Sequence, residues 1–305
     1  MMNTFGDLLI SATSQGLLWS LMAIGVYLTF RILDLADMTA EGSFPLGGAI
    51  TTMCLIKGIN PILATAAAFG GGMIAGLITG VLNTKLKIPD LLAGIVTMTG
   101  LYSITSRVMQ NAANVSLLGK DTIFTIAQNW GLARTNAVIV MGLIIALLVI
   151  IILVAFFKTE IGLAMRATGD NPEMSAANGI KTQSMKICGY MISNGCIALS
   201  GALLAQNNGF ADLNSGVGTL VVGLASIIIA EVLLHNLGIS ARLLTLVLGA
   251  IVYRIILALV FQMNVQPSDA KLASALVLVI CLALPNFHLL HHHHGGTKNV
   301  TRTRN

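Results

Sequence analysis

Residues 137–157, with the sequence AVIVMGLIIALLVIIILVAFF, decide the class of this protein because the whole stretch is apolar and carries no charge. As an α-helix rising about 1.5 Å per residue, it is long enough to cross a hydrocarbon core about 30 Å thick. The rest of the chain agrees, since 55% of the 305 residues are hydrophobic and only 10% are charged. Soluble domains carry about 25% charged residues. The sequence therefore predicts a protein that lies in the membrane.

Similar runs on both sides of this stretch predict an all-α, polytopic transmembrane helix bundle of eight or nine helices. The seven further runs are residues 16–33, 61–82, 91–110, 184–205, 217–234, 243–262 and 272–287, and a shorter segment at residues 42–56 would be the ninth. We expect one transmembrane domain over residues 1–287. No cleavable signal peptide is expected, because the first fifteen residues contain Asp7 but no lysine or arginine.

The basic residues predict the orientation of these helices, because lysine and arginine are enriched in cytoplasmic loops. If the polar loop at residues 158–183 is cytoplasmic and the helices alternate, most of the lysines and arginines fall on its side. The net charge of +5 then reports orientation, and no nucleic-acid partner is expected. The segment at residues 111–136 falls outside. Its Leu, Ile, Phe and Trp residues predict a structured flap that either covers helix ends or docks a partner.

Cysteines and histidines give no sign of a redox or metal centre. The cysteines stand apart in apolar surroundings without CxxC spacing, so we interpret them as packing residues; they are Cys54, Cys188, Cys196 and Cys281. The tail at residues 288–305, HLLHHHHGGTKNVTRTRN, is predicted to be disordered. Its histidines fit a tail composition or a cloning remnant, and no metal site is expected.

Small residues recur every fourth position in the run at residues 61–82. They are Ala68, Gly72, Gly76 and Gly80. This spacing lines one helix face with small side chains, which lets a neighbouring helix approach closely. We therefore predict tight helix packing here, without chemistry.

A polar segment, DLADMTAEGSFPLGG at residues 34–48, follows the first helix. Irregular polar backbone at membrane depth is tolerated only where protein buries it or where it lines a cavity. We therefore expect a broken or re-entrant element near residues 39–54 beside a translocation path. Its path-lining candidates are Asp37, Thr39, Glu41, Ser43, Phe44 and Pro45. The alternative is a cytoplasmic loop followed by a short helix.

Four hydroxyl side chains share one face of the helix at residues 91–110, with spacing i, i+3, i+4 and i+7. They are Thr99, Tyr102, Ser103 and Ser106. A polar stripe in lipid must face inward, so we expect it either to line the same path or to form interhelical hydrogen bonds.

Glu231 and Arg254 are candidate charges within the membrane, where such residues tend to be functional. If the intervening hairpin turns near residues 237–240, the helical rise separates their depths by roughly 12 Å. A direct pair is therefore not expected. We expect Arg254 to bond backbone carbonyls of a broken helix or to face a subunit interface.

The loop GLAMRATGDNPEMSAANGIKT, residues 162–182, contains the signals of a short capped helix. Asn171 is suited to the N-cap, Pro172 to the first helical turn, and Gly179 to the position after the helix end. We predict a helix at residues 172–178. Its small side chains suit insertion into a partner's groove, and Arg166 is available to bond a carboxylate or carbonyl.

This loop resembles the coupling loop of type II ABC importer permeases in the ribose and branched-chain amino acid branch. Two other stretches are similar to that family: GLLWSLMAIGVYLTFRILDLADMTAEGSFPLGGA at residues 16–49 and IPDLLAGIVTMTG at residues 88–100. The motifs GDNPEMSAANGI and DMTAEGSFPLGGA most resemble the subgroup associated with tryptophan- or tyrosine-type substrates. The acidic entry at Asp34, Asp37 and Glu41 departs from sugar- and branched-chain-type relatives.

The resemblance implies a transport subunit, not an enzyme, that imports a small organic solute such as an aromatic or branched-chain amino acid across a bacterial inner membrane. It implies a permease homodimer, an external solute-binding protein, and a cytoplasmic ABC ATPase dimer that binds ATP and Mg. No cofactor is expected in this chain. The residues implied to couple to the ATPase are Gly162, Arg166, Gly169, Asn171, Pro172, Glu173, Ala176, Ala177 and Gly179.

Two other function classes are open to such a sequence. The chain has no GxxxxGK[ST] phosphate loop and so is not itself the ATPase. A gradient-driven secondary transporter or channel would use acids such as Asp37 and Glu41 to bind a coupling cation. An intramembrane enzyme would need a metal motif or a nucleophile with its base, and neither an HExxH motif nor a Ser and His pair is found.

Overall fold

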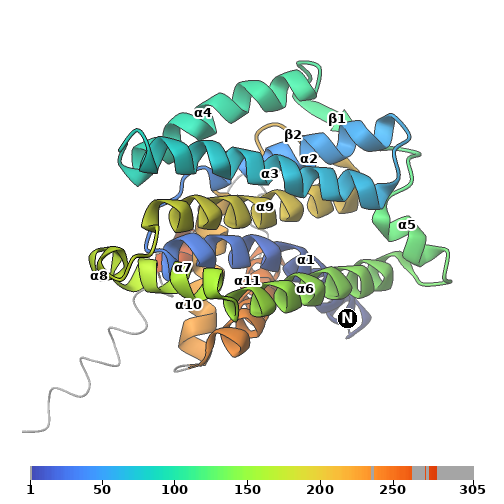
Figure 1. The fold of residues 1–305 in the computed structure, drawn as a ribbon. Helices are drawn as coiled ribbons and strands as arrows, with labels where there is room; N and C mark the ends of the chain where they lie inside the picture. The colour runs from blue at the N-terminus through green and yellow to red at the C-terminus, as the bar shows by residue number, and fades with distance from the viewer. Residues whose placement is uncertain (1, 235–236, 263–271, 273–274, 280–305) are drawn as a thin grey trace, which may run out of the picture.

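The computed structural model describes residues 2–234, 237–262, 272 and 275–279, and it is a bundle of long helices (Figure 1). The helices are α1 (Met2–Tyr27), the π-helix η1 (Leu28–Ile32), α2 (Ala40–Ile56), α3 (Pro61–Thr84), α4 (Asp90–Val108), α5 (Ile123–Gln128), α6 (Arg134–Phe157), α7 (Glu160–Asp170), α8 (Pro172–Ala177), α9 (Thr182–Asn208), α10 (Thr219–Leu233) and α11 (Ile239–Gln262). Two short strands, β1 (Asn114–Ser116) and β2 (Phe210–Asp212), pair antiparallel.

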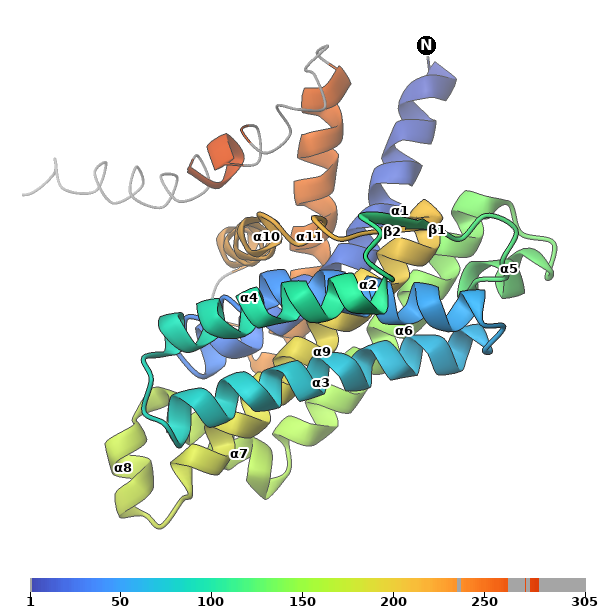
Figure 2. The same ribbon diagram turned by 90° about the horizontal axis from the view of Figure 1, so that it is seen from above.

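Six of these helices are long and apolar enough to cross a membrane: α1 with η1, α3, α4, α6, α9 and α11. The shorter α2 packs against α9 and α3, whereas α10 packs against α11 and α1 and is seen end-on in Figure 2. This confirms the all-α polytopic bundle, and the ninth segment expected at residues 42–56 is indeed helical as α2. Of the helix expected at residues 272–287, only residues 272 and 275–279 are described. Cys281 and the tail at residues 288–305 lie outside the described residues.

Helix α9 forms the centre of the bundle and packs most extensively against α3, α2 and α1. The stripe of small residues predicted in α3 makes this possible. A Cβ built on Gly76 would lie 2.1 Å from the carbonyl oxygen of Tyr190, and one on Gly72 would lie 2.3 Å from that of Asn194. Only hydrogen fits at these positions, so the prediction of close packing is confirmed.

The segment near residues 39–54, expected to be broken or re-entrant, is one continuous 17-residue helix, α2, so it is not broken. The irregular backbone lies earlier, at residues 33–39, where Asp34 adopts a φ of +53°. Pro45 inside α2 removes the helical hydrogen bond to the carbonyl of Glu41. Gly216 packs against that carbonyl instead, and a Cβ there would lie 1.8 Å from its oxygen. Burial by neighbouring elements therefore keeps a proline-containing helix intact.

The two ends of the bundle differ in structure (Figure 1). One end carries α7 and α8, and we call it the α8 end. The opposite end carries α5, the two strands and the start of α1. The flap expected at residues 111–136 is structured, because it contains β1 and an α5 helix capped by Thr122. Its strand joins the segment that follows α9.

Candidate functional site

Helix α8 is an exposed, locally capped helix, as the sequence predicted. The Asn171 side-chain oxygen accepts a hydrogen bond from the Met174 backbone N–H at 2.9 Å. Gly179 follows the helix with a φ of +82°, which favours glycine. Within Pro172–Ala177 only Ser175 is buried, so Pro172, Glu173, Ala176 and Ala177 present their side chains outward.

The segment before α8 is a second helix, α7, where the sequence predicted a loop. Its glycines pack against this chain rather than facing outward. A Cβ on Gly162 would lie 2.2 Å from the carbonyl oxygen of Phe156, and one on Gly169 would lie 1.7 Å from that of Ile32. Arg166 is exposed. Of the predicted coupling residues, Gly162 and Gly169 therefore allow α7 to pack closely against the rest of the chain. Arg166 and the α8 residues remain accessible to a partner.

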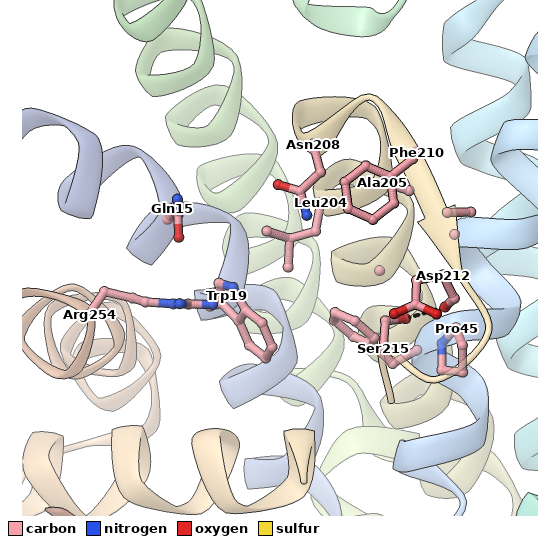
Figure 3. Close-up of a pocket in the computed structure, with 14 residues that line it drawn as sticks. Gln15, Trp19, Pro45, Leu204, Ala205, Asn208, Phe210, Asp212, Ser215 and Arg254 are labelled. Atoms are coloured by element: carbon pink, nitrogen blue, oxygen red, sulfur yellow. Dashed lines mark hydrogen bonds between the residues drawn. The ribbon is translucent and has the colours of Figure 1, made fainter. Parts of the chain in front are cut away.

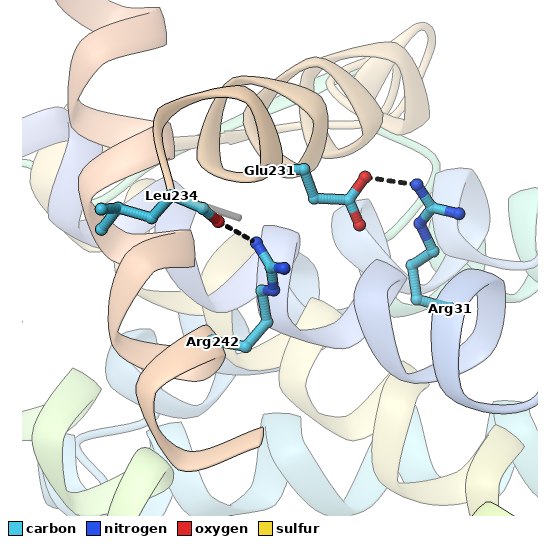
Figure 4. Close-up of polar contacts among 4 residues, drawn as sticks. All are labelled: Arg31, Glu231, Leu234 and Arg242. Carbon is cyan, nitrogen blue, oxygen red and sulfur yellow. Dashed lines mark hydrogen bonds and ion pairs between the residues drawn. The ribbon is translucent and has the colours of Figure 1, made fainter. Parts of the chain in front are cut away.

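Helix α7 rests on η1, and η1 is tied to α10 by an ion pair (Figure 4). Arg31 donates to the Glu231 carboxylate. Arg242 donates to the Leu234 carbonyl at 2.8 Å beside it. Glu231 therefore pairs with Arg31 and not with Arg254, and the absence of a Glu231–Arg254 pair was expected. The pair with Arg31 was not predicted, because Arg31 and Glu231 are 200 residues apart in the sequence and no short-range pattern links them.

A buried hydrogen-bond network holds the segment between η1 and α2. The Asn194 side-chain amide donates to the Asp37 carboxylate at 2.7 Å, and its oxygen accepts from the Ser43 hydroxyl at 2.7 Å. The other Asp37 oxygen accepts from the Thr39 backbone N–H at 2.9 Å. The Thr39 and Thr79 hydroxyls lie 2.8 Å apart. Asp37, Thr39 and Ser43 are therefore brought together, with Asn194 and Thr79 as members that the sequence reading missed.

The hydroxyl stripe of α4 faces away from the bundle of this chain, so the expected inward orientation was wrong. Tyr102 is 52% exposed, while α4 buries its opposite face, including Gly94 and Leu101. The Thr99 hydroxyl donates to the Ile95 carbonyl of its own helix rather than to a neighbour. Ser106 lies 3.5 Å from the Asn111 side chain. The helical spacing of these residues correctly predicted that they share one face of α4, but it could not predict which way that face points.

Three of these hydroxyl residues line a groove of about 300 Å³, which we call the α4 groove. Its walls are Glu41, Gly42, Pro45, Met98, Thr99, Tyr102, Ser103, Leu213, Asn214, Gly216 and Val217. The Glu41 carboxylate accepts from the Gly218 backbone N–H at 3.0 Å. The groove therefore joins the hydroxyl stripe to the predicted path residues Glu41 and Pro45.

A second hollow, the Arg254 cavity, has a volume of about 310 Å³ (Figure 3). Its walls are Gln15, Trp19, Phe44, Pro45, Gly48, Gly201, Leu204, Ala205, Asn208, Phe210, Ala211, Asp212, Ser215 and Arg254. The guanidinium carbon of Arg254 lies 4.4 Å from the Trp19 ring centroid. Trp19 stacks on Phe44 with centroids 5.2 Å apart. Arg254 thus contacts an aromatic ring, which was not predicted. The expectation that it faces a subunit interface stays a prediction.

Comparisons with known proteins agree with this architecture. Residues 8–284 match the family described as "Branched-chain amino acid transport system / permease component". The chain is 39% identical over 281 residues to the tyrosine transport system permease protein of Clostridioides difficile (strain R20291), covering 92% of each. It is 28% identical to the inner membrane ABC transporter permease protein YjfF of Escherichia coli (strain K12), covering 86% of this chain and 78% of that one.

A solved structure shares the fold. PsaBC from Streptococcus pneumoniae in complex with Fab matches with a TM-score of 0.51 at 15% identity, covering 92% of this chain and 95% of that one. The membrane spans, the exposed capped helix and the family match over most of the chain lead to one assignment. The chain is a multi-pass plasma-membrane protein that belongs to the branched-chain amino acid transport permease family, as the permease component of an ABC transporter.

Proposed function

We propose that this chain is the translocating subunit of an ATP-driven importer for an amino acid of the aromatic type. The observation that carries this proposal is α8, a locally capped helix whose small side chains are exposed. A capped, exposed helix suits docking into a groove of a cytoplasmic ATPase. The name of the Clostridioides difficile relative supports tyrosine or a similar amino acid as the substrate.

The energy for transport would come from partner subunits. An ABC ATPase dimer binding ATP and Mg would move α8 as it closes and opens, and α7 would pass this motion to η1, against which it packs. An external solute-binding protein would deliver the substrate. The chain itself acts in this scheme by binding and moving, not by catalysis.

We further propose that two copies of this chain assemble with their α4 grooves facing each other. The hydroxyl side chains of Tyr102 and Ser103 are exposed on the surface of a single chain. Polar side chains facing lipid are unfavourable, and a second copy would cover them while leaving a path between the subunits into which these hydroxyl groups project. Glu41 would lie on the wall of that path.

The coupling proposal is tested by introducing a charge on α8. Ala176→Glu places a carboxylate on an exposed position of that helix, and we expect loss of the ATPase from the purified complex or at least a tenfold decrease in ATP-driven uptake into vesicles. Ala113→Glu is the matched control, because Ala113 is also exposed but lies near the strands at the opposite end. It should keep the ATPase bound.

Two results would overturn the proposal. Normal ATP-driven uptake by the Ala176→Glu variant would remove α8 from the coupling role. Uptake by the wild-type protein in vesicles without ATP would indicate a gradient-driven carrier or channel. Both Asp37 carboxylate oxygens already accept hydrogen bonds from the protein, which makes this acid a poor ligand for a coupling cation.

A further inference from the structure

Arg254 is a cation inside the bundle that lacks an anionic partner among the described residues. It lies within α11, where a guanidinium is costly to bury alone. Its contact with the Trp19 ring is a cation–π interaction, which uses the face of the guanidinium. Its Nε atom is buried without a hydrogen-bond partner, and the ion pair of the described residues joins Arg31 to Glu231 instead. Guanidinium N–H groups donate along the edge of the plane, so the contact with Trp19 leaves these donors to another group.

Open space surrounds this side chain on several sides. Arg254 lines the Arg254 cavity and two further hollows of about 310 and 300 Å³. It shares the first of these with Trp19 and the second with Gln15. Among the described walls of both hollows, Arg254 is the only charged residue. The guanidinium therefore borders space that a mobile anion can enter.

The acid of the Arg254 cavity gives the space an electrostatic direction. Figure 3 shows Asp212 and Arg254 on different sides of the cavity, with the Trp19 side chain between them. One Asp212 carboxylate oxygen accepts from the Asn214 backbone N–H at 3.0 Å. An anion in the cavity is attracted by Arg254 and repelled by Asp212. The two charges therefore favour an anion on the Arg254 side.

The size, lining and position of the cavity suit a small organic anion that comes from outside. Its volume is about 310 Å³, and its walls include the apolar side chains of Phe44, Leu204 and Phe210. It lies toward the end opposite α8, because it is built from the last turn of α9, from β2 and from the segment after it. The orientation expected from the basic residues puts this end outside. A solute released there would meet Arg254 before the buried network around Asp37.

We propose that Arg254 binds the carboxylate of the transported amino acid within the permease. The carboxylate accepts hydrogen bonds from the edge of the guanidinium, which can offer two parallel donors, and the apolar part of the solute lies along the cavity wall. Asp212 makes no bond to the solute. This site rests on the proposed import of an amino acid and adds the group that recognises it. It predicts that binding requires the carboxylate but not the ammonium.

Trp19 provides a local readout of this binding, because it contacts Arg254 and is one of two tryptophans in the chain. Trp130→Phe removes the other, which is 65% exposed. This full-length variant is placed in phosphatidylcholine nanodiscs, and Trp19 fluorescence is excited at a wavelength where tyrosine hardly absorbs.

Three matched probes are titrated into this sample. They are L-tyrosine, 3-(4-hydroxyphenyl)propionate, which lacks the ammonium, and L-tyrosine amide, which lacks the carboxylate charge. We expect the first two to change the fluorescence at similar concentrations, and the amide to need about tenfold more, because it cannot form the charge-assisted bonds. No response to either carboxylate at millimolar concentration would overturn the proposal, as would equal responses to L-tyrosine and its amide.

Variants of Arg254 in the same background assign the preference to its charge. Arg254→Gln should weaken binding of both carboxylates about tenfold and leave binding of the amide unchanged, so that the three probes become alike. Arg254→Lys keeps the charge and should keep the preference. Retained binding of the amide distinguishes this result from general loss of structure. Arg107→Gln, exposed near the same end, is the matched control and should bind like the parent. A preference that survives in Arg254→Gln would overturn the proposal.

An anionic lipid headgroup could supply the same chemistry, so the titration is repeated in nanodiscs that contain phosphatidylglycerol. We expect an unchanged response to L-tyrosine. Loss of the response in these nanodiscs would identify a headgroup as the occupant of the site and would overturn the assignment to the solute.

The outcomes also separate this site from the proposed function. If an ATPase assembles with the chain and drives uptake, but the Arg254→Gln variant keeps the preference for a carboxylate, the importer stands and the Arg254 site is wrong. If the carboxylates bind with the expected preference but no ATPase assembles, the Arg254 site stands and the ATP-driven import is wrong.

Discussion

Asn194 shows how one side chain joins three parts of the bundle. Its amide donates to Asp37 and to the Tyr190 carbonyl, and its oxygen accepts from Ser43. Asp37 is only 1% exposed, so this acid depends on Asn194 and on the Thr39 backbone for its hydrogen bonds. A buried polar group without a partner costs about 1–3 kcal/mol. Asn194 therefore keeps the irregular segment at residues 33–39 buried.

Replacing Asn194 should destabilise the protein more than its size suggests. Asn194→Leu keeps the branched shape of the side chain but leaves Asp37 and Ser43 without this partner, so we expect the free energy of unfolding to fall by about 2 kcal/mol. Thermal unfolding in detergent measures the effect. Asn129→Leu, at an exposed position, should leave the unfolding temperature unchanged. An unfolding temperature for Asn194→Leu equal to that of the control would mean that the network contributes nothing to stability.

At the scale of elements, α7 and η1 connect the exposed helix α8 to the bundle. Gly169 lets α7 approach the carbonyl of Ile32 at the end of η1. A π-helix is an irregular element that often occurs at functional positions. The Arg31 to Glu231 ion pair attaches the same element to α10, and its partial exposure gives it a small contribution to stability, about 1 kcal/mol or less. The ion pair therefore matters more for holding η1 beside α10 than for the stability of the protein.

The glycine at the α7 contact is a sensitive test of this connection. Gly169→Ala should push α7 away from η1, because the added Cβ would lie 1.7 Å from the Ile32 carbonyl oxygen. We expect the ATPase still to bind, since α8 is unchanged, but ATP-driven uptake to fall at least tenfold. Gly70→Ala is the control, because a Cβ at that helical position meets nothing within 4 Å. Full uptake by Gly169→Ala would show that the contact is not part of the coupling route.

The elements also show which features the sequence was able to predict. The helix at residues 172–178 was predicted almost to its last residue, because Asn171, Pro172 and Gly179 act on their immediate neighbours. Helix α7 was missed because Gly162 and Gly169 disfavour a helix locally and are explained only by packing against distant residues. The partners of Glu231 and Arg254 were missed for the same reason. Local sequence signals therefore predicted helices and their caps, whereas the contacts between helices could be seen only in the structure.

At the scale of the whole molecule, the α4 groove places hydroxyl side chains on the outside of a membrane protein, among apolar neighbours such as Met98 and Val217. The helical period correctly grouped Thr99, Tyr102 and Ser103, but only the arrangement of the bundle shows that they face outward. On the α6 side of the molecule, exposed side chains such as Ile151 are apolar and suited to lipid. Helix α4 also exposes apolar side chains such as Val96 and Ile104, so its hydroxyl stripe, rather than a polar face as a whole, sets it apart from the α6 side.

Cysteine cross-linking in native membranes tests the proposed pairing of two copies. Ser103→Cys should form disulfide-linked dimers on mild oxidation, because Ser103 would lie near the line where the two grooves meet. Ile151→Cys, exposed on the lipid-facing side, should remain monomeric. Gel electrophoresis without reductant distinguishes the two. Dimers from Ile151→Cys but not from Ser103→Cys would place the subunit contact on the α6 side.

The burial of α9 also bears on how the chain is made. Its mean hydropathy is 1.5, against 3.6 for α6, and it carries Asn194 and Gln206 into the membrane. Their partners Ser43 and Thr65 belong to α2 and α3 and leave the ribosome earlier. During biosynthesis α9 would therefore enter the bilayer beside helices that already offer it hydrogen bonds. A mutation that disrupts α2 or α3 would then first cause failed membrane insertion of α9, which is synthesised more than a hundred residues after Ser43 and Thr65.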